Sequence, residues 1–105
     1  MPVRVIVNPA AGQGACGKAW PEIEAGLRSA LGDIDVYITA HAGDETDLAR
    51  QGIADGAEHF IAVGGDGTMN GVLNGIMGDG VPDNDQVRLS VIPAGTANEL
   101  SLIHI

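Results

Sequence analysis

The sequence predicts an α/β domain with a parallel sheet, its elements in the order βαβαβαβ. Short apolar runs rich in β-branched residues alternate along the chain with longer segments in which apolar residues recur every three or four positions. Loops of small residues join these segments, and glycine accounts for 16 of the 105 residues. Strands separated by helices pair in parallel through right-handed crossovers, so their carboxyl ends meet at one edge of the sheet.

The first predicted strand is Val3 to Val7, which is short and β-branched. Residues 8–17 follow as a loop of small residues. A helix is expected from about Lys18 to Leu31, with Pro21 in its first turn, where a missing N–H costs little, and Gly32 as its end. The apolar residues on one face of this helix are Trp20, Ile23, Leu27 and Leu31.

The second strand and helix are predicted at Ile34 to Thr39 and at about Glu45 to Ala54. Apolar and polar side chains alternate along the strand, as they do in a strand with one buried face. Asp44 is a candidate N-cap, and the acidic Glu45 and Asp47 suit the first helical turn, where they complement the helix dipole. The run of acids therefore has a structural explanation.

The third strand and helix are joined by a glycine turn. Phe60 to Val63 predicts a buried strand, residues 64–67 read GGDG, and a helix is expected from Thr68 to Met77. Such a turn aims backbone N–H groups at one point, on the positive end of the helix dipole, so we expect a phosphate site. A carboxylate repels phosphate, so Asp66 favours a role with Mg²⁺ or with an acceptor group. The alternative is an Asx-type turn in which Asp66 satisfies loop N–H groups.

The rest of the chain supplies a fourth strand, Val87 to Ile92, and a small-residue loop at residues 93–98. A polar loop at residues 78–86 precedes this strand and contains a second GDG, which we interpret as a surface turn. The last residues read LSLIHI and show no recognisable element. They resemble the translation of a sequencing-library adapter, so we expect a truncated domain at residues 1–99 and a non-native tail at residues 100–105.

Composition limits the possible partners. The formal net charge is −9 and the few basic residues are scattered, so the basic patch that nucleic-acid binding requires is missing and an anionic membrane surface would repel the chain. A phosphate site must therefore rely on backbone N–H groups, helix dipoles and a divalent cation. The single Cys16 excludes an internal disulfide and a cysteine metal cluster. With no leader and no apolar run of roughly 18 residues, we expect a cytoplasmic location.

The first loop fits two known phosphate motifs incompletely. Gly12 to Gly17 has the G-x-G-x-x-G spacing of dinucleotide sites, but the end of the second predicted strand offers no acid to hold a ribose. The same residues almost form a P-loop, because Lys18 follows Gly17, but Ala19 stands where a hydroxyl should bind Mg²⁺. A glycine-rich turn without a ligand is the remaining alternative.

A further interpretation combines three loops. NPAAGQG, GGDGTMN and PAGTAN follow the first, third and fourth predicted strands and so lie at the same edge of the sheet. With these motifs the stretch from Val3 to Glu99 resembles the catalytic domain of the diacylglycerol kinase family, which includes bacterial lipid kinases and sphingosine kinases. The resemblance implies a Rossmann-like three-layer domain, the N-terminal one of two. NAD kinases share GGDG-type loops, but the opening NPAAGQG favours the lipid-kinase side.

The resemblance also implies ATP and Mg²⁺ as cofactors. Asp66 would be the catalytic residue, because it could orient or deprotonate the lipid hydroxyl or help to hold Mg²⁺; the metal ligands themselves are not identified. Thr96 would close over the phosphates, and residues 65–71 would form the main ATP loop. The residues implied to bind the nucleotide are Asn8, Gly12, Gly14, Thr39, Gly65, Asp66, Gly67, Thr68, Met69, Asn70, Gly71, Gly95, Thr96 and Asn98.

The chain departs from the family pattern in two ways. Gly71 stands where the family usually has Glu directly after GGDGTxN, and the family's C-terminal, mostly β domain, with lipid-binding and further catalytic residues, has no counterpart in this sequence. We therefore expect ATP-dependent phosphorylation of a lipid hydroxyl by the full-length enzyme, with transient membrane-surface contact there, and an inactive fragment here. The alternatives are an NAD-kinase-like nucleotide kinase and a non-catalytic nucleotide-binding fragment. The sequence predicts no oligomeric state.

Overall fold

The computed structural model describes residues 3–41, 43–77, 87–93 and 103–104. Its elements in chain order are β1 (Val3–Val7), α1 (Ala15–Leu31), β2 (Asp35–Ile38), α2 (Asp44–Ala54), β3 (His59–Gly64), α3 (Asp66–Met77), β4 (Arg88–Pro93) and β5 (Ile103–His104). The sheet order is β2-β1-β3-β4-β5, with β1 to β4 parallel and β5 antiparallel to β4. The predicted α/β fold with a parallel sheet is confirmed.

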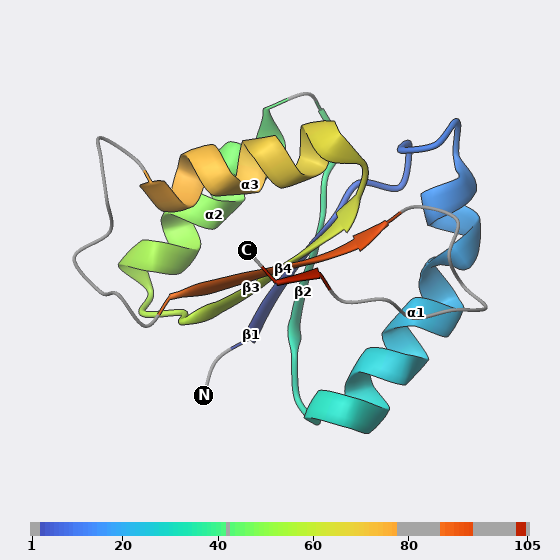
Figure 1. The fold of residues 1–105 in the computed structure, drawn as a ribbon, viewed down its shortest axis with the longest axis horizontal. Coiled ribbons are helices and arrows are strands. Elements are labelled where there is room, and N and C mark those ends of the chain that lie inside the picture. Colours follow the sequence, from blue (N-terminus) through green and yellow to red (C-terminus); the bar gives the residue numbers. More distant parts are fainter. Residues whose placement is uncertain (1–2, 42, 78–86, 94–102, 105) are drawn as a thin grey trace.

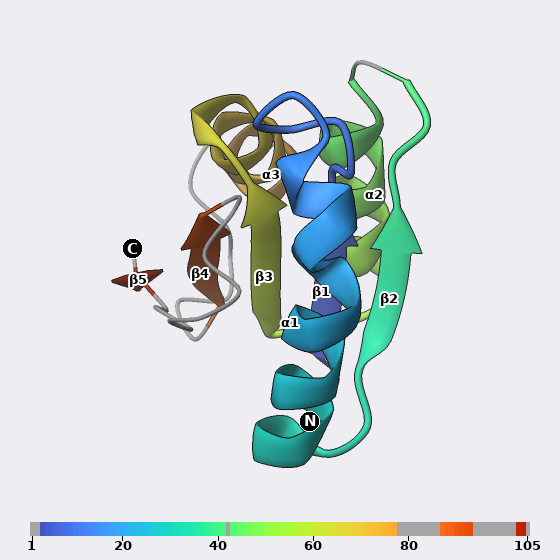
Figure 2. The same ribbon diagram turned by 90° about the vertical axis from the view of Figure 1, so that its right-hand side faces the viewer.

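Helices cover both faces of the sheet: α1 lies on one face, and α2 and α3 lie together on the other (Figure 1). Figure 2 shows α1 in front of the strands and the two other helices behind them. On the α1 side, Val5 and Val63 belong to the same buried cluster as Ile23. On the opposite side, Phe60 packs in a cluster with Val72. Successive residues of the central strands are therefore apolar on both faces, as expected for a parallel sheet between two helical layers.

The helix pair α2 and α3 packs closely because small residues face each other. A Cβ placed on Gly75 would lie 2.6 Å from the Cβ of Ala49 and 3.1 Å from the backbone N of Arg50. The Thr46 hydroxyl donates a hydrogen bond of 2.8 Å to the Gly71 carbonyl and joins the two helices near their starts. This packing fixes the start of α2 beside the start of α3.

All three helices start earlier than predicted. α1 begins at Ala15, three residues earlier than expected, because Gly14 takes a left-handed conformation (φ 91°) and its carbonyl accepts the N–H of Lys18. Pro21 consequently lies inside the helix, and its expected place in the first turn is wrong. α2 begins at Asp44 with Gly43 as its N-cap, so the prediction that Asp44 is the cap is also wrong.

Two further expectations are corrected. Asp66 is the first residue of α3 and does not lie within a loop, because only Gly65 separates β3 from the helix. In the tail, Ile103 and His104 form a short strand that pairs with Val91 and Ser90 of β4, so the expectation of no recognisable element is wrong for these two residues. The second GDG and the loop at residues 78–86 lie outside the described residues. No helix in the described part of the chain is long and apolar enough to span a membrane.

Candidate functional site

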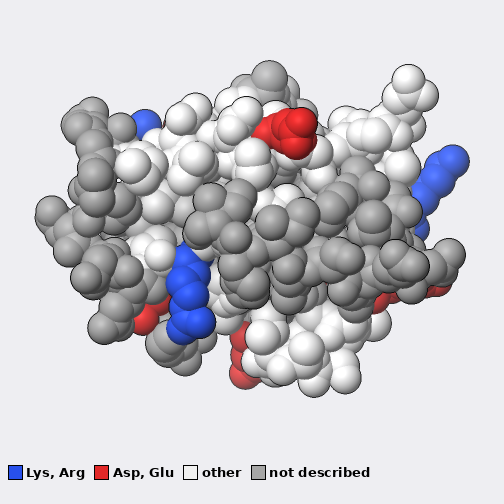
Figure 3. All heavy atoms as spheres, in the orientation of Figure 1, with Lys and Arg blue, Asp and Glu red and all other residues white. Residues whose placement is uncertain are grey.

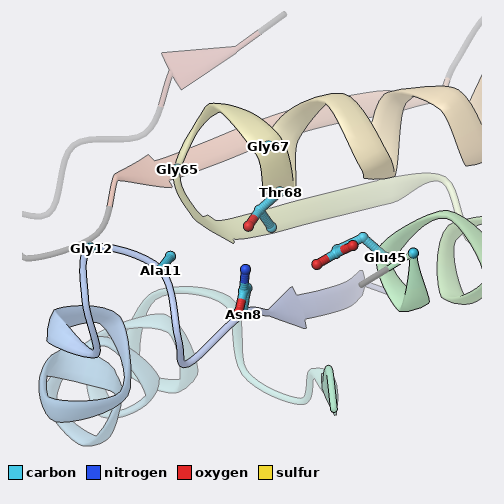
Figure 4. Close-up of a pocket in the computed structure, with 8 residues that line it drawn as sticks. Asn8, Ala11, Gly12, Glu45, Gly65, Gly67 and Thr68 are labelled. Carbon is cyan, nitrogen blue, oxygen red and sulfur yellow. The ribbon is translucent and has the colours of Figure 1, made fainter. Parts of the chain in front are cut away.

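The carboxyl edge of the parallel strands carries two adjoining cavities. The larger cavity, of about 470 Å³, is lined by Asn8, Ala11, Gly12, Gly43, Glu45, Gly65, Gly67 and Thr68 (Figure 4). The smaller, of about 360 Å³, is lined by Asn8, Pro9, Ala10, Thr39, Ala40, His41 and Glu45. Asn8 and Glu45 line both. The loops after β1, β2 and β3 thus contribute to one site, as expected for the edge of a parallel sheet where ligands bind.

The start of α3 offers the larger cavity a set of free backbone donors. Within the described part of the chain, no acceptor is bonded to the N–H groups of residues 65–68; the first N–H to find one is that of Met69, which donates to the Gly65 carbonyl at 3.1 Å. A Cβ added at Gly65 or Gly67 would meet no atom within 4 Å, so the backbone here faces open space. Free N–H groups at a helix N-terminus favour an anion, and phosphate fits them.

Thr68 adds a buried hydroxyl to the same cavity. The residue is 2% exposed, and its Oγ1 has no hydrogen-bond partner among the described residues. It lies against Gly64, where a Cβ would contact Oγ1 and come within 2.9 Å of the Thr68 Cβ. A buried hydroxyl without a partner costs about 1–3 kcal/mol, so an oxygen or nitrogen of a ligand in the cavity would restore a lost hydrogen bond.

Asn8 is held in place by the loop that it begins. Its backbone N–H donates to the Val63 carbonyl at 3.0 Å, and its Oδ1 accepts the N–H of Ala10 at 3.1 Å. The side-chain nitrogen points into the larger cavity, toward Thr68 (Figure 4). Asn8 is therefore positioned to donate a hydrogen bond to a ligand bound at the start of α3.

Glu45 contributes the carboxylate of the site. The residue lies in the first turn of α2, is only 8% exposed and lines both cavities. Its carboxylate points into the space between Asn8 and Thr68 (Figure 4). It makes no hydrogen bond or ion pair with any residue in the described part of the chain. Sequence reasoning attributed this acid to the helix dipole and missed its position beside a ligand cavity.

Gly71 makes room for Glu45. A Cβ on Gly71 would lie 3.0 Å from the Glu45 Cβ and 3.3 Å from its Oε2. A side chain at position 71 would therefore compete with Glu45 for the same space. The space beside Gly71, where the chain departs from the family pattern, is thus occupied by the Glu45 side chain from another helix.

The first loop uses most of its backbone donors internally. The N–H of Gly14 donates to the Ala10 carbonyl at 3.1 Å, that of Cys16 to Ala11 at 3.2 Å and that of Gly17 to Pro9 at 3.0 Å. Among the loop residues from Ala10 to Gly17, only Gly12 and Gln13 have N–H groups that reach no described acceptor. Neither the dinucleotide motif nor the P-loop motif therefore presents the row of free N–H groups on which its phosphate binding depends.

The structure brings together part of the predicted site. Asn8, Gly12, Gly65, Gly67 and Thr68 line the larger cavity, and Thr39, which is 8% exposed, lines the smaller one. The predicted residues that line neither cavity are Gly14, Asp66, Met69, Asn70 and Gly71. Gly95, Thr96 and Asn98 lie outside the described residues. In the larger cavity, the residues that sequence reasoning missed are Ala11, Gly43 and Glu45. In the smaller cavity they are Pro9, Ala10, Ala40, His41 and again Glu45. The loop after the second strand, which lies at the same edge, was the available signal.

Two titratable groups near the site have structural roles. The Asp44 carboxylate accepts the backbone N–H groups of Ala40 and His41, each at 2.8 Å, and these bonds lower its pKa. Burial raises the pKa of the Cys16 thiol, which lies in the core against the Val63 carbonyl and stays protonated. Among the described residues, no group of three His, Cys, Asp or Glu could hold a metal ion.

Figure 3 shows the basic side chains of one face far apart, without a basic patch.

Known proteins are similar to this chain in sequence and in fold. The family model for the diacylglycerol kinase catalytic domain matches residues 2–103. Over 103 residues the chain is 34% identical to a diacylglycerol kinase of Staphylococcus aureus (strain JH9), covering 97% of this chain and 31% of the relative. Over 96 residues it is 33% identical to a diacylglycerol kinase of Staphylococcus carnosus (strain TM300), covering 91% of this chain and 30% of that protein.

A solved structure gives the same result. The crystal structure of a diacylglycerol kinase from Bacillus anthracis str. Sterne superposes with a TM-score of 0.70 at 33% sequence identity, covering 90% of this chain and 33% of that one. The chain thus spans about a third of the length of the proteins that it matches. A matched family model over nearly all residues and a shared fold lead to one conclusion: the chain belongs to the diacylglycerol kinase catalytic domain family.

Proposed function

We propose that this chain is the nucleotide-binding part of an enzyme that transfers the γ-phosphate of ATP to the hydroxyl of a diacylglycerol-like lipid. The observation that carries the proposal is the start of α3, where the N–H groups of residues 65–68 have no acceptor among the described residues and lie beside an open cavity. Matched relatives named diacylglycerol kinase support the choice of reaction. The chain spans about a third of the length of those relatives. We assign lipid binding to the part of the protein outside this chain.

The residues of the site fit a triphosphate. Backbone donors at residues 65–68 and the dipole of α3 stabilise phosphate oxygens, the dipole by roughly 0.3–2 kcal/mol. The Thr68 hydroxyl and the Asn8 amide add two side-chain donors within the same cavity. No Lys or Arg is among the described residues that line either cavity. Phosphoryl transfer depends on positioning and charge neutralisation, so this donor set supplies the positioning and leaves most of the charge to a cation.

Mg²⁺ is the cation that we propose for this role. Magnesium is usually bound by one or two carboxylates together with substrate phosphates, and it does not need a complete protein cage. Asp66, exposed at the first residue of α3, is the carboxylate that we assign to Mg²⁺ or to the lipid hydroxyl. It lines neither cavity, so it would act at the outer rim of the site, where an acceptor would approach.

The reaction would take place at the cytoplasmic side of a membrane, where ATP and a lipid acceptor meet. The formal net charge of −9 makes this chain itself a poor partner for an anionic lipid surface. We therefore assign the transient membrane contact to the part of the protein outside this chain.

Calorimetric titration of the chain with ATP and Mg²⁺, and in parallel with adenosine, tests the nucleotide site. We expect ATP to bind at least tenfold more tightly than adenosine, because the free N–H groups bind the phosphates. Equal affinities would contradict the proposal, and so would no binding of either ligand.

The reaction is tested with the full-length protein, by measuring the transfer of labelled γ-phosphate from ATP to diacylglycerol in mixed micelles. The variant Asp66→Asn should keep its affinity for ATP and lose most of its turnover. Unchanged turnover in that variant would remove Asp66 from the chemistry. Absence of lipid phosphorylation by the unmodified protein would contradict the lipid-kinase assignment while leaving the nucleotide site intact.

A further inference from the structure

We propose that Glu45 binds the ribose hydroxyls of the nucleotide and so makes the site selective for ribonucleotides. This inference rests on the proposed function, because it assigns one residue to one part of the nucleotide. It adds a residue from α2 to a site otherwise made by the loops after β1 and β2 and by the start of α3.

The first argument is the state of the carboxylate. Glu45 is 92% buried, but no hydrogen bond or ion pair joins it to a described residue. Its carboxylate faces the cavities without a described donor, so a ligand can donate hydrogen bonds to it, and hydrogen bonds to a charged acceptor are stronger than those between neutral groups. The neighbouring acids of the same helical turn differ in this respect. Asp44 accepts two backbone N–H groups, and Asp47 is exposed to solvent.

The second argument is the position of Glu45 between the two cavities. The larger cavity contains the free N–H groups of α3, which we assign to the phosphates, and the smaller one is lined by Thr39 and by the loop that follows it. Asn8 and Glu45 line both, so a ligand that extends from one cavity into the other passes between these two side chains. In a nucleoside triphosphate, the ribose connects the phosphates to the base.

The chemistry of the ligand identifies the contact. A carboxylate accepts hydrogen bonds and donates none, so it suits neighbouring hydroxyl groups and is repelled by phosphate oxygens. Two vicinal hydroxyls can donate to its two oxygens, which is how an acidic residue holds a ribose in other nucleotide-binding folds. Glu45 at the junction therefore fits the sugar better than it fits the phosphates.

The position of Gly71 beside Glu45 allows a second test of the inference, in which the carboxylate is moved from position 45 to position 71. The atoms nearest to a Cβ on Gly71 are all in the Glu45 side chain, at 3.0, 3.3 and 3.6 Å. A carboxylate carried by position 71 would enter the same space once Glu45 is removed. Exchanging the two residues, in the double variant Glu45→Gly with Gly71→Glu, keeps composition and charge and moves only the point of attachment.

The experiment compares ATP with 2′,3′-dideoxy-ATP, both with Mg²⁺, by calorimetric titration of the 105-residue chain. In the unmodified chain we expect ATP to bind about tenfold or more tightly than the dideoxy analogue, since hydrogen bonds to a charged acceptor are strong. Glu45→Gln should weaken ATP binding and reduce the preference to less than threefold, with no change for the analogue. Asp47→Asn is the matched control, because it removes the same charge from the same turn outside both cavities. It should keep the full preference.

The outcomes separate the two proposals. If the unmodified chain does not bind ATP more tightly than adenosine, the proposal of a nucleotide site at the start of α3 is contradicted. If it binds ATP but shows no preference over the dideoxy analogue, or if Glu45→Gln weakens both ligands equally, the ribose assignment is overturned. Equal weakening of both ligands by Glu45→Gln would indicate a contact with Mg²⁺ or a structural role. The exchange variant, Glu45→Gly with Gly71→Glu, tests whether both positions can place the carboxylate at the ribose. If it recovers at least half of the lost preference for ATP over the dideoxy analogue, on a logarithmic scale, the shared position is supported. No recovery would contradict it.

Discussion

The starts of α1 and α3 lie at the same edge of the sheet, and both follow a parallel strand through glycine-rich sequence. They nevertheless differ in what they offer a ligand. At α1, the N–H groups of Gly14, Cys16 and Gly17 are bonded to carbonyls of the preceding loop. At α3, the N–H groups of residues 65–68 have no acceptor in the described part of the chain.

The length of the connection explains the difference. Residues 8–14 separate β1 from α1, and this loop folds back so that its own carbonyls accept the N–H groups of the helix start. Only Gly65 stands between β3 and α3, which leaves no loop to supply acceptors. A glycine-rich turn before a helix therefore binds an anion only when its backbone N–H groups are not bonded to carbonyls of the loop. A short connection between strand and helix keeps these N–H groups free.

Gly64→Ala should have the largest effect at α3. A Cβ at position 64 would come within 2.9 Å of the Thr68 Cβ and must displace the first turn of the helix. We expect the free energy of unfolding to fall by about 1–3 kcal/mol, as in other overpacked sites, and ATP affinity to fall more than tenfold. Chemical denaturation and calorimetry measure the two quantities.

Gly14→Ala is the corresponding change at α1. A Cβ at Gly14 meets no atom within 4 Å, and the cost, about 1–2 kcal/mol, comes from its left-handed conformation at φ 91°. ATP affinity should stay within twofold of the unmodified chain, because Gly14 lines neither cavity. A tenfold loss of affinity here would show that the two helix starts bind the ligand together.

Gly67→Ala should reduce affinity without reducing stability. The added methyl group meets no protein atom within 4 Å and projects into open space beside the larger cavity. Alanine in place of glycine stabilises a helix by up to about 1 kcal/mol, so the melting temperature should rise while ATP affinity falls about tenfold. Asn74→Ala, at an exposed position of the same helix, should raise the melting temperature and leave affinity unchanged. Unchanged affinity in Gly67→Ala would place the phosphates elsewhere.

Among the three changes at the start of α3, Thr68→Val should have the smallest effect on binding. It removes a buried hydroxyl that has no described partner, so stability should be equal or higher by up to about 1 kcal/mol. ATP affinity should fall about fivefold through loss of one donor. The control Thr46→Val removes a hydroxyl bonded to the Gly71 carbonyl and should cost about 1 kcal/mol of stability. A stabilised Thr68→Val variant with unchanged affinity would show that the hydroxyl serves no ligand.

Sequence reasoning predicted the bounds of β3 and α3 to within two residues, because their signal is contiguous. A buried strand, one glycine turn and a helical period follow one another in residues 60–77, so the local pattern contains the geometry. The start of α1 was placed three residues late, because glycine-rich sequence does not indicate which loop carbonyls accept the helix N–H groups. Met69, predicted to bind the nucleotide, packs against the core cluster between the sheet and α2 and α3.

The sequence by itself determined the elements, their order and the parallel sheet, because hydrophobic period and turn residues act over short distances along the chain. It also determined the family, through loops that are each continuous. Only the tertiary structure decided the position of Glu45 beside the two cavities. Its burial depends on the packing of α2 against α3, and the space that it fills exists because Gly71, in a different helix, has no side chain. Contacts between distant segments have no local pattern, and this one appears only when the two helices are packed together.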